Sequence, residues 1–294
     1  MANVFTNTNT DALSTIVLDE LMKSLAPVTA FTLDASPQAF YRGDRVKVLS
    51  VDTASAATTF TTAYEMQDVG AKTKDIPLTH SYTSAQLSDA DWRNSGLLTI
   101  DAFARSKAHA LGKKILDDTF TYFSASATTC PTSMSVSTTS MRLNAVMSAS
   151  NLLDNNNAEP GGRVLILAPS YHQALRTDTA VQNAASFGGS EAVRRGEIPN
   201  IDTFERVVKC NNMPNGVAGF AVAPSAGVIA MRAVETQDRE MYQLVQSYTD
   251  EATGVTITSK RWGDHDAGAV RQVWETNFGV ASGNKNAIVM LYEE

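Results

Sequence analysis

Ala223-Pro224-Ser225-Ala226-Gly227 is the segment of this chain with the most obvious potential for chemistry. A serine between small residues after an apolar strand is typical of the nucleophile elbow of serine hydrolases. The elbow needs glycine two residues before the serine, because the backbone there is too tight for a Cβ, and this chain has Ala223 at that place. The segment therefore predicts a plain strand-to-helix turn, and we assign no catalytic residue.

The segment 279–285 (GVASGNK) superficially resembles a phosphate-binding loop. Its glycine spacing is short, and Asn284 separates Gly283 from Lys285, so the Gly-Lys-Ser/Thr sequence that would hold phosphates is missing. We expect a β-hairpin turn at Gly283-Asn284 and no bound cofactor.

Asp264-His265-Asp266 places three possible metal ligands in a row. Consecutive side chains on an extended segment alternate between faces, so the three cannot readily meet one ion. A solvated loop is the better interpretation, and no metal site is assigned. Three other histidines are isolated in sequence: His80, His109 and His172. Of these, His109 is expected on the surface of a long helix.

The two cysteines, Cys130 and Cys210, are far apart in the sequence. The chain starts without a secretory signal pattern, so two reduced thiols in a cytoplasmic environment are expected. Lys209 is the basic residue nearest to Cys210, and its side chain should point to the other face of the strand. An unreactive thiol, buried or at a rim, is predicted at this position, and a single disulfide stays possible without being implied.

Composition excludes several classes of protein. Hydrophobic residues make up 43% of the 294 residues and charged ones 19%, so the chain is neither disordered nor strongly solvating. The formal net charge of −7 disfavours a direct grip on a phosphate backbone, although a protein that merely encloses nucleic acid needs no basic patch. No apolar run approaches the roughly 20 residues of a membrane-spanning helix.

The elements that would position these residues begin with the stretch from 161 to 214. Residues 163–168 form a short apolar run that predicts a buried strand, and Pro169 starts a helix after it. Gly188-Gly189-Ser190 is a break, Arg194-Arg195-Gly196 a turn, and residues 204–210 a second strand. This is the layout of a small αβ unit.

The N-terminal part predicts an arm and a hairpin. The first residues are polar through Thr10, and a short amphipathic helix from Leu13 to Met22 follows, with little core of its own. Strands are expected at 45–51 and 76–82. The residues between them carry few large hydrophobic side chains, so we expect a thin hairpin that extends from the body and needs a partner surface.

The strongest helical pattern runs from Leu97 to Phe123. At 1.5 Å per residue, about 27 residues reach roughly 40 Å, and Gly112 is the weak point of this spine. Residues 84–94 predict a short helix in which Asp89, Asp91, Trp92 and Arg93 have capping and pairing roles. Residues 124–140 are of low complexity and predict a boundary, and another helix is expected at 139–154.

The last third of the chain predicts strands. One is expected at 219–223, and a short helix or strand at 226–230. The tail has four further strand-like segments: 240–246, 255–258, 268–276 and 287–292. The predicted class is α+β.

This ordered set of elements resembles the major capsid proteins of tailed double-stranded DNA phages, the Hong Kong 97 fold family. Gly162 to Pro169 is similar to the family's central strand entering its axial domain. A second similarity is to the stretch in which many members run from Gly-x-Ile through a strand to Asn-x-Pro. The matching residues here are Gly196-Glu197-Ile198-Pro199, the strand after them and Asn211-Asn212-Met213-Pro214. The resemblance covers most of the chain, and its weight lies in the order of short motifs.

The resemblance implies a division of the chain. Residues 1–40 would be an N-terminal arm and 41–82 an extended loop. Residues 83–130 and 236–294 would form a peripheral domain with the spine helix, and 131–235 an axial domain, whose predicted loops become candidates for contacts around a capsomer axis.

The resemblance also implies a function. The chain would be a non-enzymatic coat protein that forms pentamers and hexamers of an icosahedral shell around a packaged double-stranded DNA genome. It would be assembled in the host cytoplasm into a virion, with a separate scaffolding protein, a portal and a decoration protein as further partners, and without contact to a membrane. Some relatives cross-link a lysine of the loop to the next subunit; Lys72 and Lys74 are present here, but that chemistry is not carried over.

Two alternatives remain at this point. An encapsulin-type compartment shares the fold and encloses enzymes, and it would need a pocket for a cargo peptide. A small-molecule enzyme would use the αβ unit as a catalytic domain, which the incomplete motifs argue against. Removal of residues 52–75 is expected to leave a folded protomer that cannot assemble.

Overall fold

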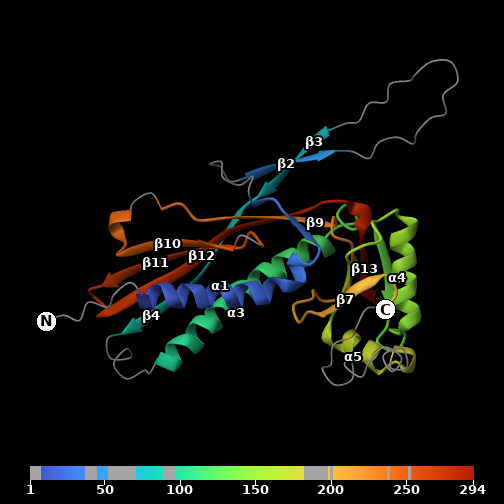
Figure 1. Cartoon of the computed structure of the whole chain (residues 1–294), viewed down its shortest axis with the longest axis horizontal. Helices are drawn as coiled ribbons and strands as arrows, with labels where there is room; N and C mark the ends of the chain where they lie inside the picture. The colour runs from blue at the N-terminus through green and yellow to red at the C-terminus, as the bar shows by residue number, and fades with distance from the viewer. Residues whose placement is uncertain are drawn as a thin grey trace, which may run out of the picture.

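Two β-sheets and a pair of long helices make up the body of the protein (Figure 1). The structure is a computed structural model and describes residues 8–36, 45–51, 71–88, 97–181, 198, 201–236, 239–250 and 253–294. The predicted α+β class is confirmed. Within the described helices, no segment is both long and apolar enough to cross a membrane.

The first sheet has six strands in the order β1-β9-β12-β11-β10, with β4 paired to β12 beside β9. Its long central strand is β12, which pairs with β4 through its first part and with β9 through its last part. The strands have these bounds: β1 Thr32–Asp34, β4 Thr79–Ser88, β9 Gly227–Arg232, β10 Leu244–Thr249, β11 Thr256–Asp264 and β12 Ala269–Ser282. The 3-10 helix η2 (Arg239–Met241) precedes β10.

The second sheet has five strands in the order β5-β13-β8-β6-β7. Helix α4 (Leu143–Asn155) packs against β5, β8 and β13. Helix α5 (Pro169–Thr177) follows β6 directly, as the proline after the apolar run predicts. The strands have these bounds: β5 Thr132–Val136, β6 Arg163–Leu167, β7 Phe204–Lys209, β8 Val217–Val222 and β13 Ile288–Glu293.

Helices α1 (Thr8–Thr29) and α3 (Leu97–Ser124) pack together along one face of the first sheet (Figure 1). Leu21 and Leu25 of α1 are fully buried with Leu111 and Ile115 of α3. Glu20 links the two helices, because its carboxylate lies 3.3 Å from Arg105 Nη1 and 3.1 Å from His109 Nε2. The prediction of a short helix with little core was therefore wrong: α1 is 22 residues long and is part of the main core.

The spine helix α3 also joins the two sheets into one core. Phe120 stacks on Phe220 of β8 with a centroid distance of 5.6 Å, and Phe123 meets Phe31 edge-on at 5.7 Å. Asn212 Nδ2 donates to Asp117 Oδ1 of α3 at 2.9 Å. Aromatic pairs of this kind add about 1 kcal/mol each beyond the area they bury. The long spine helix predicted from periodicity is confirmed as a shared support.

Arg163 is fully buried at the start of β6. Its guanidinium donates to the carbonyls of Ala158 and Glu159 at 2.9 and 2.8 Å and pairs with Asp154 at 2.7 Å. Backbone carbonyls left unpaired in a buried site cost free energy, and one arginine satisfies two of them here. Arg163 thereby ties the connection between α4 and β6 to the start of β6, and Glu205 accepts a further hydrogen bond from the Gly162 amide at 2.8 Å.

The predicted helix at 84–94 was wrong for the part that the structure describes. Residues 79–88 form β4, whose ladder with β12 runs from Phe278↔Thr79 to Ala269↔Ser88. Its burial alternates, with Ser81 and Ala85 buried and Tyr82 and Gln86 exposed. A ten-residue antiparallel ladder outweighs the weak helical preference of this segment. Residues 89–94, including the predicted roles of Asp89 to Arg93, lie outside the described residues.

Several predicted boundaries also change. Helix α4 starts at Leu143 instead of residue 139, and the segment 124–140 holds strand β5 as well as a connection. Residues 227–232 are a strand, β9. Gly283-Asn284 is not a hairpin turn, because β12 and the following β13 lie in different sheets and the 3-10 helix η3 (Lys285–Ala287) connects them.

Sheet membership crosses the segment limits that the resemblance implied. The first sheet takes β1 from the predicted arm and β9 from the predicted axial segment 131–235. The second sheet takes β13 from the predicted peripheral segment 236–294. Three connections therefore run between the two sheets, so the chain does not divide at residue 235 alone.

The packing of α1 against α3 explains why residue 112 is a glycine. A Cβ added there would lie 2.8 Å from Ser24 Cβ of α1, closer than real Cβ contacts. The glycine lets the two helices approach at their crossing, which accounts for the apparent weak point in the spine.

We predict that Gly112→Val lowers the free energy of unfolding by about 2 kcal/mol, because the added branches meet Ser24 and force the helices apart. Ala110→Val, at an exposed position two residues away on the same helix, is the matched control and should cost less than about 0.7 kcal/mol. Urea unfolding of the purified protomers measures both. Helix propensity alone predicts no loss for Gly112→Val, because valine is a better helix former than glycine, so an unchanged or higher stability of this variant would contradict the role of the crossing.

Candidate functional site

A two-stranded hairpin stands off the body above the first sheet (Figure 1). It consists of β2 (Arg45–Val51) and β3 (Ala71–Pro77), in register from Arg45↔Pro77 to Val51↔Ala71. The predicted hairpin is confirmed, but its second strand starts at Ala71, and after Leu78 the chain leaves the hairpin as β4 of the first sheet. The residues between the strands, 52–70, lie outside the described residues.

The root of the hairpin is held by a small apolar cluster of its own. Val46 and Ile76 are buried across from one another and pack on three alanines of the body. The alanines come from the chain after α1, from β9 and from β12: Ala35, Ala230 and Ala281. Three larger apolar side chains are partly buried against this cluster, so a small set of apolar contacts holds the root to the body: Val48, Leu78 and Val228.

Gly279 of β12 lets the hairpin approach the sheet closely. A Cβ at this position would lie 2.8 Å from Ile76 Cγ2 and 2.5 Å from the Pro77 carbonyl oxygen. The backbone of the hairpin root therefore lies directly against β12. Of the sequence motif 279–285, this glycine contributes close packing and no phosphate cradle.

Lys74 adds a polar contact at the same root. It faces the body beside Ile76, whereas Lys47 and Asp75 point outward and are exposed. Its ammonium donates to Ser282 Oγ at 2.5 Å and to the Ser282 carbonyl. Burial, together with the positive charge of Lys285, lowers the pKa of Lys74 below its usual value.

The face of the first sheet opposite α1 and α3 carries a buried ion cluster. Glu275 of β12 pairs with Lys260 of β11 and, through its other oxygen, with His80 Nε2 of β4 at 2.9 Å. The side chains of Glu275 and Lys260 are only 6% and 11% exposed, although they lie on an outer face. The Lys260 ammonium also lies 5.5 Å from the centre of the Tyr242 ring.

Aromatic side chains surround this cluster. Tyr82 is 67% exposed beside His80, and Tyr242 meets Trp262 edge-on at 5.6 Å. The connection from β9 toward β10 crosses the same face, since the Val234 amide donates to Thr258 Oγ1 at 3.0 Å. An outer sheet face with exposed aromatic residues and a buried charge pair is a surface suited to contact with another protein.

Ser225 lies in a tight turn between β8 and β9, where the Ala226 amide donates to the Ala223 carbonyl at 3.0 Å. The turn leads to a strand and not to the predicted helix. The Ser225 hydroxyl is buried and makes no hydrogen bond to any described residue. The structure therefore brings no general base to this serine from the described part of the chain.

The segment 264–266 is the turn between β11 and β12, as its interpretation as a loop predicted. Asp264 accepts hydrogen bonds from the amides of Asp266 and Ala267 at 3.1 and 3.2 Å, and its other oxygen pairs with Arg271 at 2.7 Å. Its carboxylate is thus used to shape the turn. Over the described ranges, no three His, Cys, Asp or Glu side chains come together as a metal site.

Both cysteines are buried, and the other two histidines considered differ in burial. Both thiols are free and buried, and burial raises the pKa of Cys130 to about 11 and that of Cys210 in the same direction. His109 is exposed, as predicted. His172 is buried in α5, and burial followed by the charges of Lys209 and Arg176 lowers its pKa. The loops 188–190 and 194–196 lie outside the described residues.

Sequence reasoning missed Lys260 and Glu275 as a pair and Ser282 as the hydrogen-bond acceptor of Lys74. Their partners are remote in sequence: Lys74 and Ser282 are 208 residues apart, and His80 and Glu275 are 195 apart. A polar residue at alternate positions of a strand is normally solvated, so nothing local indicates burial at Glu275.

The fold of this chain is similar to solved structures from phages. The capsid structure of the cyanophage P-SCSP1u superposes with a TM-score of 0.64 at 14% identity, covering 90% of this chain and 86% of that one. A structure from Mycobacterium phage Che8 superposes with a TM-score of 0.57 at 17% identity and covers 85% of both chains. The predicted resemblance to phage capsid proteins is thus confirmed at the level of the fold.

A virus-like particle from Pyrococcus furiosus has the same fold. It superposes with a TM-score of 0.60 at 14% identity, covering 96% of this chain and 98% of that one. No protein-family model and no curated protein sequence matches the chain.

We predict that Glu275→Gln lowers the free energy of unfolding by about 3 kcal/mol, because it leaves the Lys260 ammonium buried without a counterion. The double variant Lys260→Met/Glu275→Gln removes both charges and should recover at least half of that loss. Urea unfolding of the two single variants and the double variant forms a complete cycle. Additive effects would show that the pair is not coupled.

Proposed function

We propose that this chain is a major capsid protein that assembles into the pentamers and hexamers of an icosahedral shell around double-stranded DNA. The observation that carries the proposal is the fold itself, shared over 85–90% of the chain with structures from phages, together with a hairpin that leaves the body. The function lies in contacts between copies and not in catalysis. The virion is the site of the protein, after assembly in the host cytoplasm.

The hairpin supports this proposal because the described part of the protomer gives it few packing contacts. Within the described residues, β2 and β3 pair only with each other, and only the root packs on the body. Isolated two-stranded hairpins are marginal in water. A neighbouring subunit that receives the hairpin supplies the missing surface, and repetition of that contact closes a ring.

Charge supports enclosure of DNA without a specific grip on it. The chain has 31 acidic and 24 basic residues, a net charge of −7. Attraction to phosphates depends on clustered lysine and arginine, so an acidic wall holds packaged DNA by confinement. The segments 1–40, 41–82, 83–130 with 236–294, and 131–235 are proposed as arm, extended loop, peripheral domain and axial domain, with the changes in sheet membership described above. A scaffolding protein, a portal and a decoration protein are proposed partners.

A protein-filled compartment of the encapsulin type is the second candidate. The Pyrococcus furiosus virus-like particle, whose structure covers 96% of this chain, leaves this candidate open. The two candidate shells differ in what they enclose. Expression followed by size-exclusion chromatography, negative-stain microscopy and nuclease protection separates them: shells with protected DNA support the capsid, shells with protein cargo support the compartment, and a stable monomer or dimer contradicts both.

We predict that replacing residues 52–70 by an Asn-Gly turn between Val51 and Ala71 abolishes closed shells. The design retains Val46, Lys74 and Ile76, so the root and the body keep their packing and the protomer should unfold within about 2 °C of the intact chain. Assembly is measured by sedimentation and negative-stain microscopy, and unfolding by circular dichroism. Closed shells formed at the same yield by this variant would disprove the role of the hairpin.

A further inference from the structure

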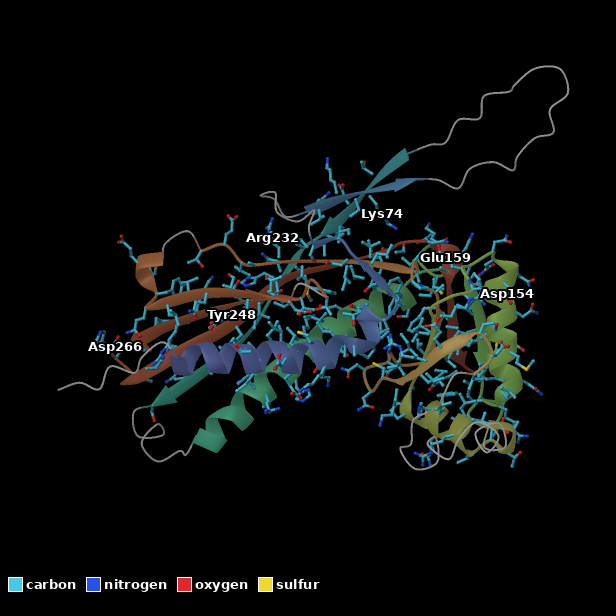
Figure 2. All side chains as sticks on the ribbon, viewed as in Figure 1. Lys74, Asp154, Glu159, Arg232, Tyr248 and Asp266 are labelled. Carbon is cyan, nitrogen blue, oxygen red and sulfur yellow. The ribbon has the colours of Figure 1, made fainter. Side chains whose placement is uncertain are left out.

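Strand β4 forms one edge of the first sheet over its whole length. Its ladder with β12 includes every residue of the strand, and β11 lies on the other side of β12, because Glu275 pairs with Tyr82 and with Thr258. The edge extends from the hairpin, where Lys74 lies, to the end of the sheet at the β11–β12 turn, where Asp266 lies (Figure 2). Among the described strands, β12 is the only partner of β4.

This edge lacks the features that keep strand edges from pairing with other chains. Protected edge strands are typically short, charged, bulged or interrupted by proline. β4 is 10 residues long (THSYTSAQLS), contains no Lys, Arg, Asp, Glu or Pro, and pairs with β12 without a register shift. The other edge strands of the two sheets, β1, β5, β7 and β10, have only 3 to 6 residues, and the ladder of β7 contains a register shift. β4 is therefore the longest and most regular edge of the body.

The two faces of β4 differ in burial. Ser81 and Ala85 point toward the helices and are buried, whereas Tyr82 and Ser84 point to the outer face and are exposed. The Tyr82 side chain is 67% exposed, although Glu275 opposite it on β12 is buried. A side chain on an edge strand has a cross-strand neighbour on one side only. A further strand beside β4 would supply the neighbour that Tyr82 lacks on its other side.

A second copy of β4 fits this edge by symmetry. Two antiparallel copies of one strand are related by a two-fold axis perpendicular to the sheet, so α1 and α3 of both copies stay on the same side of the joined sheet. A closed shell has the same requirement, because every copy must present the same face to the outside. Since β4 contains no acidic residue, lysine or arginine, two copies meet without opposed like charges from these residues.

The alternation of faces restricts the register of such a pair. Residues directly opposite one another point to the same side, so the two-fold axis passes through a residue and not between two residues. An axis at Thr83 pairs residues 79–87 of the two copies, an axis at Ser84 pairs residues 80–88, and any other position pairs fewer. In both registers, residue 84 lies opposite or diagonal to its own counterpart, within reach of a long side chain.

We propose that β4 pairs with β4 of a second copy of this chain in an antiparallel ladder that joins the two first sheets across a two-fold axis. The pairing rests on the proposed assembly into shells and adds to it the contact between rings. A ring of subunits closes through a heterologous contact, whereas an isologous contact of this kind joins a subunit of one ring to a subunit of the next. Backbone hydrogen bonds along the edge hold the pair, and Tyr82 of each copy gains its second cross-strand neighbour.

A charge swap at residue 84 tests the pairing. Ser84→Lys and Ser84→Glu each place like charges at the axis, so the protomer concentration needed for shells should rise on the order of fivefold for either variant. An equimolar mixture of the two variants brings opposite charges together and should restore assembly to near the level of the intact chain. Only a contact in which residue 84 meets its own counterpart gives this rescue. Sedimentation and negative-stain microscopy measure the assembly.

Two further variants complete the test. Ser247→Lys is the matched control, because Ser247 is an exposed serine on β10, another edge strand of the same sheet, and it should leave the assembly concentration unchanged. Ser84→Cys gives a readout that does not need shells: a short bismaleimide should link two protomers through residue 84. Cys130 and Cys210 are free and buried, so the intact chain is the background control for this reaction. Circular dichroism checks that Ser84→Lys melts at the temperature of the intact chain.

The outcomes separate this contact from the capsid proposal. Shells from Ser84→Lys at the concentration of the intact chain would overturn the pairing and leave the capsid proposal in place. Weaker assembly of both charged variants without rescue in the mixture would show that a different surface covers β4, and would overturn the second β4 as its partner. If the intact chain forms no shells, cross-linked dimers of Ser84→Cys would support the pairing and contradict the capsid proposal, and the absence of both would overturn both.

Discussion

The burial of one continuous apolar face of α3 is the constraint on which the rest of the structure depends. Leu111 and Ile115 bury against α1 under the six-stranded sheet, and Phe120 stacks on the five-stranded sheet. Because α3 packs on β4 and β12 of the first sheet and its Phe120 stacks on Phe220 of the second, one rigid helix contacts both sheets. Gly112 sets how closely α1 approaches that helix, and so it sets the thickness of the layer beneath the first sheet. The result is a body that can be repeated with constant geometry.

The root of the hairpin lies outside this main core and has a small apolar cluster of its own. The root buries Val46 and Ile76 against three alanines, with three larger apolar side chains partly buried around them. The small side chains of the body allow close approach, as Gly279 also does. Lys74 on Ser282 adds a polar contact to this cluster. Because β2 and β3 pair only with each other among the described strands, the body supports the root of the hairpin more than the part beyond it.

Local sequence patterns correctly predicted the elements whose structure is determined by their own residues. The spine helix has a long apolar stripe, and residues 163–168 form a fully apolar run before a proline, so each was recognised from its own residues. Residues 84–88 were misassigned because their strand character comes from pairing with β12, almost 190 residues away in sequence. The turn at Gly283 was misassigned for the same reason: only the tertiary structure shows that the next strand, β13, joins the other sheet. The contact of Lys74 with Ser282, like that of His80 with Glu275, joins residues about 200 positions apart, and no spacing rule reaches that far.

The contacts around Glu275 show what this long-range pairing does for a charge on the outer face of the first sheet. The Lys260 ammonium of β11 and His80 Nε2 of β4 converge on the Glu275 carboxylate of β12, so three strands are linked at one point. Loss of one partner of a buried ion pair leaves the other charge desolvated and uncompensated. The register of β11 and β12 that brings Lys260 to Glu275 is therefore one in which both buried charges are paired.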